Sequence, residues 1–311
     1  NMLSASDLSV DFIKTLFKEV KDDNFVSTIM QNKILVNVFF EPSTRTSLSF
    51  ECAMYKLGGK VITFNHDSSS IKKGESFKDT IKTLATYGDI LVLRHSDVNK
   101  IKEAKSYVNI PVINAGNGNG EHPTQSLLDL YTIYKHLLNI ELKHPISNLN
   151  NNLPNIDNTD KLKVLFVGDI MNSRTIHSLF NLLIKFDNTY IHFLPFCDCD
   201  PPVNIISKLV NKEDGNQTIV YSKYTVNIPQ YDIIYVTRLQ KERSNCKNDP
   251  DVIIDKEFMK KVKNTAIVMH PLPRNNELST CVDKNKRCYY FKQMEYGTEI
   301  RIVLLHMLLH V

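Results

Sequence analysis

Short apolar segments alternate with amphipathic ones along this 311-residue chain, and no other feature constrains its fold as strongly. The strand-like segments are residues 34–40, 61–64, 90–93, 110–113, 163–167, 190–194, 218–221, 232–236 and 266–269. Helical patterns lie between them, as in residues 47–57, which Gly58 and Gly59 can close as a C-cap. Because short buried strands joined by helices pair in parallel, the pattern predicts an α/β fold of doubly wound parallel sheets.

A polar, asparagine-rich stretch at about residues 147–160 divides the chain into two α/β halves. Its composition cannot bury an apolar face, so we interpret it as a loop insertion. We expect a first domain of residues 1–146 plus 293–311 and a second of residues 147–292. The end of the chain, residues 299–310, has a helical apolar stripe that must pack on a core, and we expect this C-terminal helix to return to the first domain.

Composition restricts the possible partners of the chain. A hydrophobic content of 42%, a charged content of 23% and a net charge of +4 are ordinary for a globular protein, so no nucleic-acid surface is expected. No apolar run is long enough to cross a bilayer, and the first residues lack a hydrophobic signal core. The six cysteines form no CxxC pair, and Cys197 and Cys199 are the only closely spaced ones. We expect idle thiols, no metal site and a cytoplasmic location, which is compatible with an organelle-targeting segment trimmed before Asn1.

The segment FFEPSTRTSLSFE, residues 39–51, predicts a phosphate site. An apolar strand ends at Glu41, and Ser43, Thr44, Arg45 and Thr46 then open a helix. A helix start presents unpaired backbone N–H groups and the positive end of the helix dipole. An ordinary helix cap would use one hydroxyl, whereas here three hydroxyls flank a guanidinium that can bind two phosphate oxygens.

Further polar groups follow other strands of the first half. His122 and Gln125 stand about one turn apart at a predicted helix start, after the glycine-rich residues 116–120. A lone histidine at a cap is usually structural, but this setting favours a site in which the neutral imidazole donates to a carbonyl oxygen. Arg94 falls at the carboxyl end of a strand, where open parallel sheets bind ligands. The lysine-bearing loop of residues 68–76 is not a P-loop and by itself is most simply a solvated turn.

The second half shows the same arrangement. Arg174 begins a predicted helix after a strand that ends in Gly168-Asp169, but the GxGxxG pattern of a dinucleotide site is missing. Arg238 and Gln240 follow another strand, and the prolines on either side of Leu272 can direct its carbonyl at a ligand. Each arginine could be a surface ion pair, yet several arginines at strand ends favour a shared anionic pocket.

Taken in order, these motifs are similar to those of a known family. They read FFEPSTRTSLSFE, SSSIKKGES, LRH, GEHPTQSLLDLYTI, GDIMNSRTIHSL, YVTRLQKER and MHPLPR, and they lie in this order within residues 36–274. The chain thereby resembles the aspartate/ornithine carbamoyltransferases. The HPLPR motif is similar to that of the aspartate branch, because the ornithine branch typically carries a cysteine-containing HCLP.

The resemblance implies a role for each matching residue. The groups implied to bind carbamoyl phosphate are Ser43, Thr44, Arg45, Thr46, Arg94, His122 and Gln125, with Ser69 and Lys73 from an adjacent subunit. Those implied to hold L-aspartate are Lys73, Arg174, Arg238, Gln240 and the carbonyl of Leu272. The groups implied to be catalytic are Thr46, Arg94, His122 and Lys73, of which the first three polarise the carbamoyl oxygen. The family also implies a homotrimer with shared active sites, and the carbamoyltransferase fold.

The implied reaction transfers the carbamoyl group of carbamoyl phosphate to the amine of L-aspartate, giving N-carbamoyl-L-aspartate and phosphate in pyrimidine biosynthesis. It requires no metal or cofactor, and both partners are small molecules. The alternatives are an ornithine or other carbamoyltransferase and a non-catalytic scaffold subunit of the same fold. The scaffold would be favoured if Arg45, His122 or Arg238 were missing, but all three are present.

Overall fold

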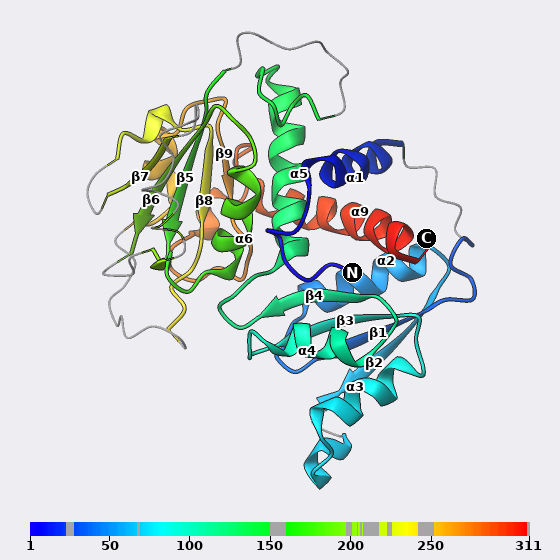
Figure 1. The fold of residues 1–311 in the computed structure, drawn as a ribbon. Coiled ribbons are helices and arrows are strands. Elements are labelled where there is room, and N and C mark those ends of the chain that lie inside the picture. Colours follow the sequence, from blue (N-terminus) through cyan, green and yellow to red (C-terminus); the bar gives the residue numbers. More distant parts are fainter. Residues whose placement is uncertain are drawn as a thin grey trace. The chain divides into compact units, whose positions relative to one another are not determined.

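The computed structural model divides the chain into two compact units, each of which is described by itself (Figure 1). Unit 1 comprises Asn1–Leu128 and Met294–Val311, and unit 2 comprises Asp129–Gln293. The structure describes residues 1–22, 28–66, 69–149, 160–196, 201–203, 205, 207, 218–222, 226–241 and 252–309. Most of the asparagine-rich stretch and the pair Cys197 and Cys199 lie outside these residues. The predicted domain ranges, 1–146 plus 293–311 and 147–292, stay a prediction.

Unit 1 is built on a four-stranded parallel sheet in the order β2-β1-β3-β4. Its strands are β1 (Ile34–Phe39), β2 (Lys60–Asn65), β3 (Ile90–His95) and β4 (Val112–Asn117). Its helices are α1 (Val10–Asp22), α2 (Arg45–Lys56), α3 (Phe77–Ala85) and α4 (Lys100–Tyr107), with a short 3-10 turn η2 (Ser70–Lys73). Two longer helices, α5 (Pro123–Asn139) and α9 (Tyr290–Leu309), have residues in both units.

The two faces of the unit 1 sheet are covered by different helices. Alternate residues of a strand point to opposite faces, so Val36 and Val38 lie on one face and Asn37 on the other. The first face packs against α3 and α4 in one buried apolar cluster. Asn37 is also buried, and its amide donates to the Ser47 hydroxyl of α2, 3.4 Å away. The sheet is therefore covered on both sides, which confirms the predicted doubly wound arrangement.

Strand β4 lies further along the chain than the predicted residues 110–113. The amino end of the chain pairs with it: the Met2 N–H donates to the Val112 carbonyl (3.0 Å), and the Asn114 N–H donates to the Met2 carbonyl (2.8 Å). The Asn114 side chain is buried and donates to the Leu3 carbonyl, 2.8 Å away. A polar residue continues the strand because residues far away in sequence satisfy its hydrogen bonds.

Unit 2 contains a five-stranded parallel sheet in the order β7-β6-β5-β8-β9. Its strands are β5 (Leu162–Gly168), β6 (Thr189–Pro195), β7 (Thr218–Tyr221), β8 (Ile233–Val236) and β9 (Ile267–Met269). Its shorter helical segments include α6 (Arg174–Leu183), η3 (Ile228–Gln230), α8 (Lys256–Lys261) and η4 (Thr280–Val282). One sheet face packs against Phe258 and Met259 of α8, while Phe180 of α6 stacks edge-on against Phe193 of β6 at 5.4 Å.

The terminal helix α9 begins at Tyr290, earlier than the predicted residue 299. From Met294 onward it belongs to unit 1, which confirms that the chain returns to its first half. Arg301 is buried there; it donates to the Ser49 hydroxyl of α2 (2.9 Å), and its guanidinium lies 5.0 Å above the ring of Phe50. Gly297 lies inside the helix because a Cβ there would come within 3.0 Å of the Leu128 side chain.

Within the described ranges, no helix combines the length and the apolar character needed to cross a bilayer. The same ranges contain no group of three or more His, Cys, Asp or Glu side chains placed to hold a metal ion. Cys52, Cys281 and Cys288 are free thiols.

Stability should depend on pH through His144, which is fully buried in unit 2. Its Nδ1 accepts from the Ile146 N–H (3.2 Å), and burial lowers the pKa of His144 to about 4. In the unfolded chain the histidine has a pKa of about 6.5 and becomes protonated below that pH, whereas in the folded chain it stays neutral down to about pH 4. The free energy of unfolding therefore falls as the pH drops from about 6.5 toward 4. Between about pH 7.5 and 5, we expect wild type to lose about 2 kcal/mol more unfolding free energy than His144→Gln. Urea denaturation at the two pH values measures this, and an equal loss in both proteins would contradict it.

Candidate active site

The loop from β1 to α2 places a helix start next to an arginine and several hydroxyls. Thr44 precedes the first residue of α2, Arg45, and its side chain makes no capping hydrogen bond. The backbone N–H groups of the first turn have no partner within the helix, so they remain available at the loop that leads into Arg45. Partial burial lowers the pKa of Arg45 below its ordinary value, but a guanidinium keeps its charge at neutral pH. This geometry suits a phosphate dianion.

Thr46 and His122 are brought together although they lie 76 positions apart in the sequence. The Thr46 hydroxyl is 3.3 Å from His122 Nε2, and both side chains are buried. The His122 carbonyl accepts from the N–H groups of Gln125 (3.0 Å) and Ser126 (3.1 Å), so His122 occupies the position directly before the first residue of α5, Pro123. His122, Gln125 and Thr46 thus belong to two helix starts at the carboxyl ends of β4 and β1.

Arg94 is tied to the same loop by a carboxylate that the sequence pattern did not reveal. Its Nε lies 3.2 Å from Glu41 Oε2, and both side chains are mostly buried. The Arg94 carbonyl also accepts from the Phe40 N–H at 2.9 Å, which joins the ends of β3 and β1. Glu41 therefore positions Arg94 beside the loop that carries Ser43 and Arg45.

Ser69 and Lys73 are placed differently. The Ser69 hydroxyl donates to the His66 carbonyl (2.8 Å), and Lys73 is exposed in η2. In the part of the chain that the structure describes, no hydrogen bond or ion pair joins either residue to Arg45 or Thr46. A single chain therefore does not bring Lys73 to the predicted phosphate loop by any such contact.

In unit 2, a buried carboxylate organises the residues predicted to hold aspartate. Asp169 follows β5 and accepts from the backbone N–H groups of Asn172 (3.0 Å) and Gln240 (3.1 Å). The Gln240 amide donates to the Asn172 carbonyl at 2.8 Å, and Arg174 begins α6 two residues later with its side chain buried. Gln240 is thus held next to the turn that leads to Arg174. The sequence marked Asp169 only as a strand end.

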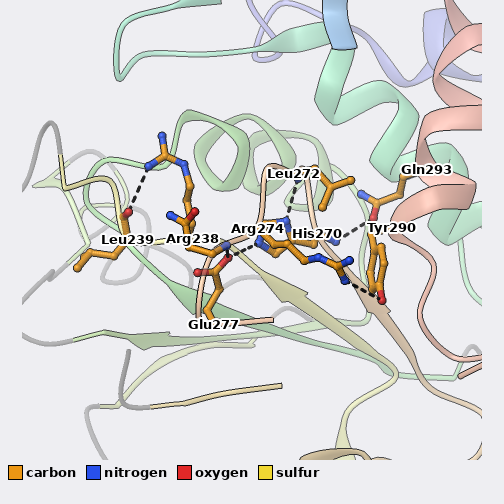
Figure 2. Close-up of polar contacts among 9 residues, drawn as sticks. Arg238, Leu239, His270, Leu272, Arg274, Glu277, Tyr290 and Gln293 are labelled. Atoms are coloured by element: carbon orange, nitrogen blue, oxygen red, sulfur yellow. Dashed lines mark hydrogen bonds and ion pairs between the residues drawn. The ribbon is translucent and has the colours of Figure 1, made fainter. Parts of the chain in front are cut away.

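Arg238 follows β8, and its Nη1 donates to the Leu239 carbonyl at 3.3 Å (Figure 2). The segment that carries it runs close to Gly168, whose backbone has a φ of 128°. A Cβ at position 168 would lie 2.3 Å from the Thr237 carbonyl oxygen. Only glycine allows this approach of two backbones.

Gly168→Ala is therefore expected to displace the segment from Thr237 to Gln240. Strain of about 1–3 kcal/mol at such a position predicts that the KM for aspartate, the amine substrate implied by the resemblance, rises roughly tenfold, while that for carbamoyl phosphate, the other implied substrate, stays unchanged. Steady-state kinetics with each substrate varied in turn measures this. Gly59→Ala is the matched control, because its Cβ would meet the flexible end of the Met54 side chain. Equal changes in both KM values would contradict the prediction.

The segment after β9 is fixed by His270 and Glu277, both buried (Figure 2). The Leu272 N–H donates to His270 Nδ1 at 2.8 Å, so the other ring nitrogen carries the proton and donates to Glu277 Oε1 at 3.1 Å. Burial alone would raise the pKa of Glu277, but hydrogen bonds from His270 and the Asn275 N–H outweigh it and lower that pKa. Leu272 has a φ of 53°, so its peptide is held in a conformation that leucine rarely adopts.

Arg274, the last residue of the HPLPR motif, has a structural partner. Its guanidinium makes two hydrogen bonds to the carboxylate of Asp283, one of them 2.8 Å long, and lies 5.5 Å from the ring of Tyr290. The ion pair with Asp283 raises the pKa of Arg274 above its ordinary value. This arginine therefore anchors the segment that carries Leu272.

Two regions of the chain match known protein families. Residues 1–135 match the aspartate/ornithine carbamoyltransferase carbamoyl-P binding domain, and residues 160–308 match the Asp/Orn binding domain of the same proteins. The chain belongs to the aspartate/ornithine carbamoyltransferase family.

Relatives of the aspartate branch match almost the whole chain. The aspartate carbamoyltransferase catalytic subunit of Thermoplasma acidophilum is 37% identical over 97% of this chain and 92% of its own length. The aspartate transcarbamoylase of Trypanosoma cruzi, solved with carbamoyl aspartate and phosphate, superimposes with a TM-score of 0.85 at 37% identity, covering 98% of this chain and 94% of that one. The same enzyme solved with N-(phosphonacetyl)-L-aspartic acid gives 0.84 at 36% identity, with the same coverage.

Proposed function

We infer that this chain is an aspartate carbamoyltransferase, which makes N-carbamoyl-L-aspartate and phosphate for pyrimidine biosynthesis. The neutral α-amine of aspartate attacks the carbamoyl carbon and forms the new C–N bond. A tetrahedral oxyanion results, the C–O bond to phosphate breaks, and phosphate leaves with the amine proton. The observation that carries this inference is the pairing of buried Thr46 and His122 beside the helix start at Arg45.

The residues of unit 1 bind carbamoyl phosphate. The helix start with Ser43, Thr44 and Arg45 holds the phosphate, because its N–H groups, hydroxyls and guanidinium are all donors. Thr46, Arg94 and His122 donate to the carbamoyl oxygen, where negative charge develops. Preorganised donors of this kind contribute about 10²–10³ each in rate. Gln125 contacts the carbamoyl NH₂ group through its amide.

The residues of unit 2 bind L-aspartate. Arg174 and Arg238 suit the two carboxylates of a dicarboxylic acid, whereas ornithine presents only one carboxylate and a second amine. Gln240, held by Asp169, adds an amide to the same group. The Leu272 carbonyl accepts from the amine that attacks.

We also propose a homotrimer in which Ser69 and Lys73 reach the active site of a neighbouring subunit. Three large apolar side chains are exposed on α2 and on β2, the edge strand of the unit 1 sheet: Leu48 is 56% exposed, Tyr55 59% and Ile62 40%. Exposed apolar groups beside an open sheet edge are typical of a subunit contact. Because no described hydrogen bond or ion pair joins Lys73 to the phosphate loop of its own chain, a neighbour's loop is its expected partner.

The direct test is a transfer assay with labelled carbamoyl phosphate and either aspartate or ornithine. We expect labelled carbamoyl aspartate and phosphate with aspartate, and no product with ornithine. Turnover of ornithine alone would instead identify the other branch of the family. In calorimetry, N-(phosphonacetyl)-L-aspartate should bind with one molecule per chain. Binding without turnover of either amine would identify a non-catalytic scaffold.

A further inference from the structure

A buried carboxylate in unit 2, Asp129, takes no direct part in the reaction. It belongs to α5 and is fully buried. Its Oδ2 accepts from the hydroxyl of Tyr235 (2.7 Å), and its Oδ1 accepts from the side-chain amide of Gln293 (2.7 Å). A buried charge is costly unless it is fully hydrogen-bonded, so both donors are required.

The Gln293 amide connects Asp129 to the segment that carries Leu272, whose carbonyl is proposed to contact the substrate. Gln293 is buried in α9, and its Oε1 accepts from the backbone N–H of His270 at 2.9 Å (Figure 2). His270 in turn fixes the N–H of Leu272 through its ring. An amide is the group that fits here, because Gln293 must accept from an N–H on one side and donate to a carboxylate on the other.

The Tyr235 hydroxyl connects Asp129 to the first turn of α6, which begins at Arg174. Tyr235 is fully buried in β8, and its hydroxyl interacts with the side chain of Thr175, the residue after Arg174. Burial and the adjacent Asp129 raise the pKa of Tyr235 well above its ordinary value, so the phenol remains a donor to the carboxylate. Tyr235 and Gln293 are therefore both donors to the Asp129 carboxylate.

We propose that Asp129 and Gln293 are positioning residues for aspartate, holding the Leu272 segment and the Arg174 helix start in one arrangement. Asp129 reaches the first through Gln293 and His270, and the second through Tyr235. The inference rests on the proposed function of unit 2. It deepens that function because a buried network, which itself does not touch the substrate, would set the geometry of the residues that bind L-aspartate.

The test uses the full chain and the pair of changes Gln293→Glu and Asp129→Asn. Gln293→Glu alone sets two buried carboxylates against each other, and we expect it to raise the KM for aspartate roughly tenfold or more. In the double variant, the new amide at position 129 donates to the new carboxylate at position 293, so the contact re-forms with donor and acceptor exchanged. The KM for aspartate should then return to within about threefold of wild type. The KM for carbamoyl phosphate should stay within about twofold throughout, because its residues lie in unit 1.

A second readout does not depend on activity. The His270 amide should exchange with solvent at least about tenfold faster in Gln293→Glu and regain protection in the double variant. If Gln293→Glu fails to fold, Tyr235→Phe removes one hydrogen bond from Asp129 without adding charge, and it should raise the KM for aspartate severalfold. Wild type that transfers no carbamoyl group to aspartate would overturn the proposed function, whereas exchange at His270 would still test the network. A folded double variant with no recovery in KM or protection would overturn the positioning role.

Discussion

Arg45→Ala is expected to lower kcat/KM for carbamoyl transfer by about 10³-fold, because an arginine that stabilises charge on phosphate oxygens contributes about that much or more. Arg45 begins α2, where the N–H groups of the first turn and the guanidinium act on the same anion. Arg45→Lys keeps the positive charge but cannot bind two phosphate oxygens in a bidentate manner, so its rate should lie between those of Arg45→Ala and wild type. Steady-state assays with saturating aspartate measure the effect, and Lys56→Ala at the far end of α2 is the matched control.

Mixing experiments test the proposed sharing of active sites between subunits of a homotrimer. Lys73→Ala, like Arg45→Ala, should be nearly inactive alone, but in the proposed homotrimer co-assembled chains of the two variants should regain activity. In a random equal mixture, half of the chains supply Arg45 and half of their neighbours supply Lys73, so about a quarter of the sites are intact. Dissociation, mixing and reassociation, followed by the transfer assay, measures this. A reassociated mixture that stays inactive would exclude a bridging role for Lys73.

His122→Ala is expected to lower kcat by about 10²–10³, with little change in the KM for aspartate, because it removes a donor that we propose acts on the oxyanion of the transition state. Thr46→Val removes a second donor that lies 3.3 Å from the same ring, so the double variant should lose less than the product of the two single effects. Rapid-quench kinetics separates chemistry from product release.

The control for the histidine is His306→Ala, which removes a histidine of α9 in the same unit. It should leave kcat within about threefold, since no transition-state donor is lost. If His122→Ala raised only the KM for aspartate, or if its effect and that of Thr46→Val multiplied fully, the two residues would not act on one oxygen.

Apolar periodicity was sufficient to predict the fold class of both units. Each predicted strand corresponds to a strand of one of the two parallel sheets, because buried strands contain runs of Val, Ile, Leu and Phe. The errors fall where a polar residue or a glycine is buried with a distant partner. Asn114 continues β4 because Leu3 accepts its amide, and Gly297 lies within α9 because Leu128 and Arg301 fill its side-chain space. Neither partner can be identified from local sequence.

The candidate site shows the same limit. Groups that we propose act on the substrate directly, such as Arg45 and His122, stand out at strand ends and helix starts. Residues that act by holding others do not. Glu41, Asp169 and Asp129 are carboxylates that each have a partner far away in the sequence, at 53, 71 and 106 or more positions respectively, and sequence spacing gives no signal for these pairs. An aspartate within the apolar run of α5 was the one local sign of a buried charge.

The pairing of the amino end with β4 has a practical consequence for anyone who handles this protein. Residues 1–3 supply bonds that the buried Asn114 side chain and the adjoining backbone would otherwise lack. An affinity tag or a fused partner joined at this end must leave those residues extended. A fusion that displaces residues 1–3 would remove the hydrogen bonds that they make to β4, and it would loosen the segment between β4 and His122.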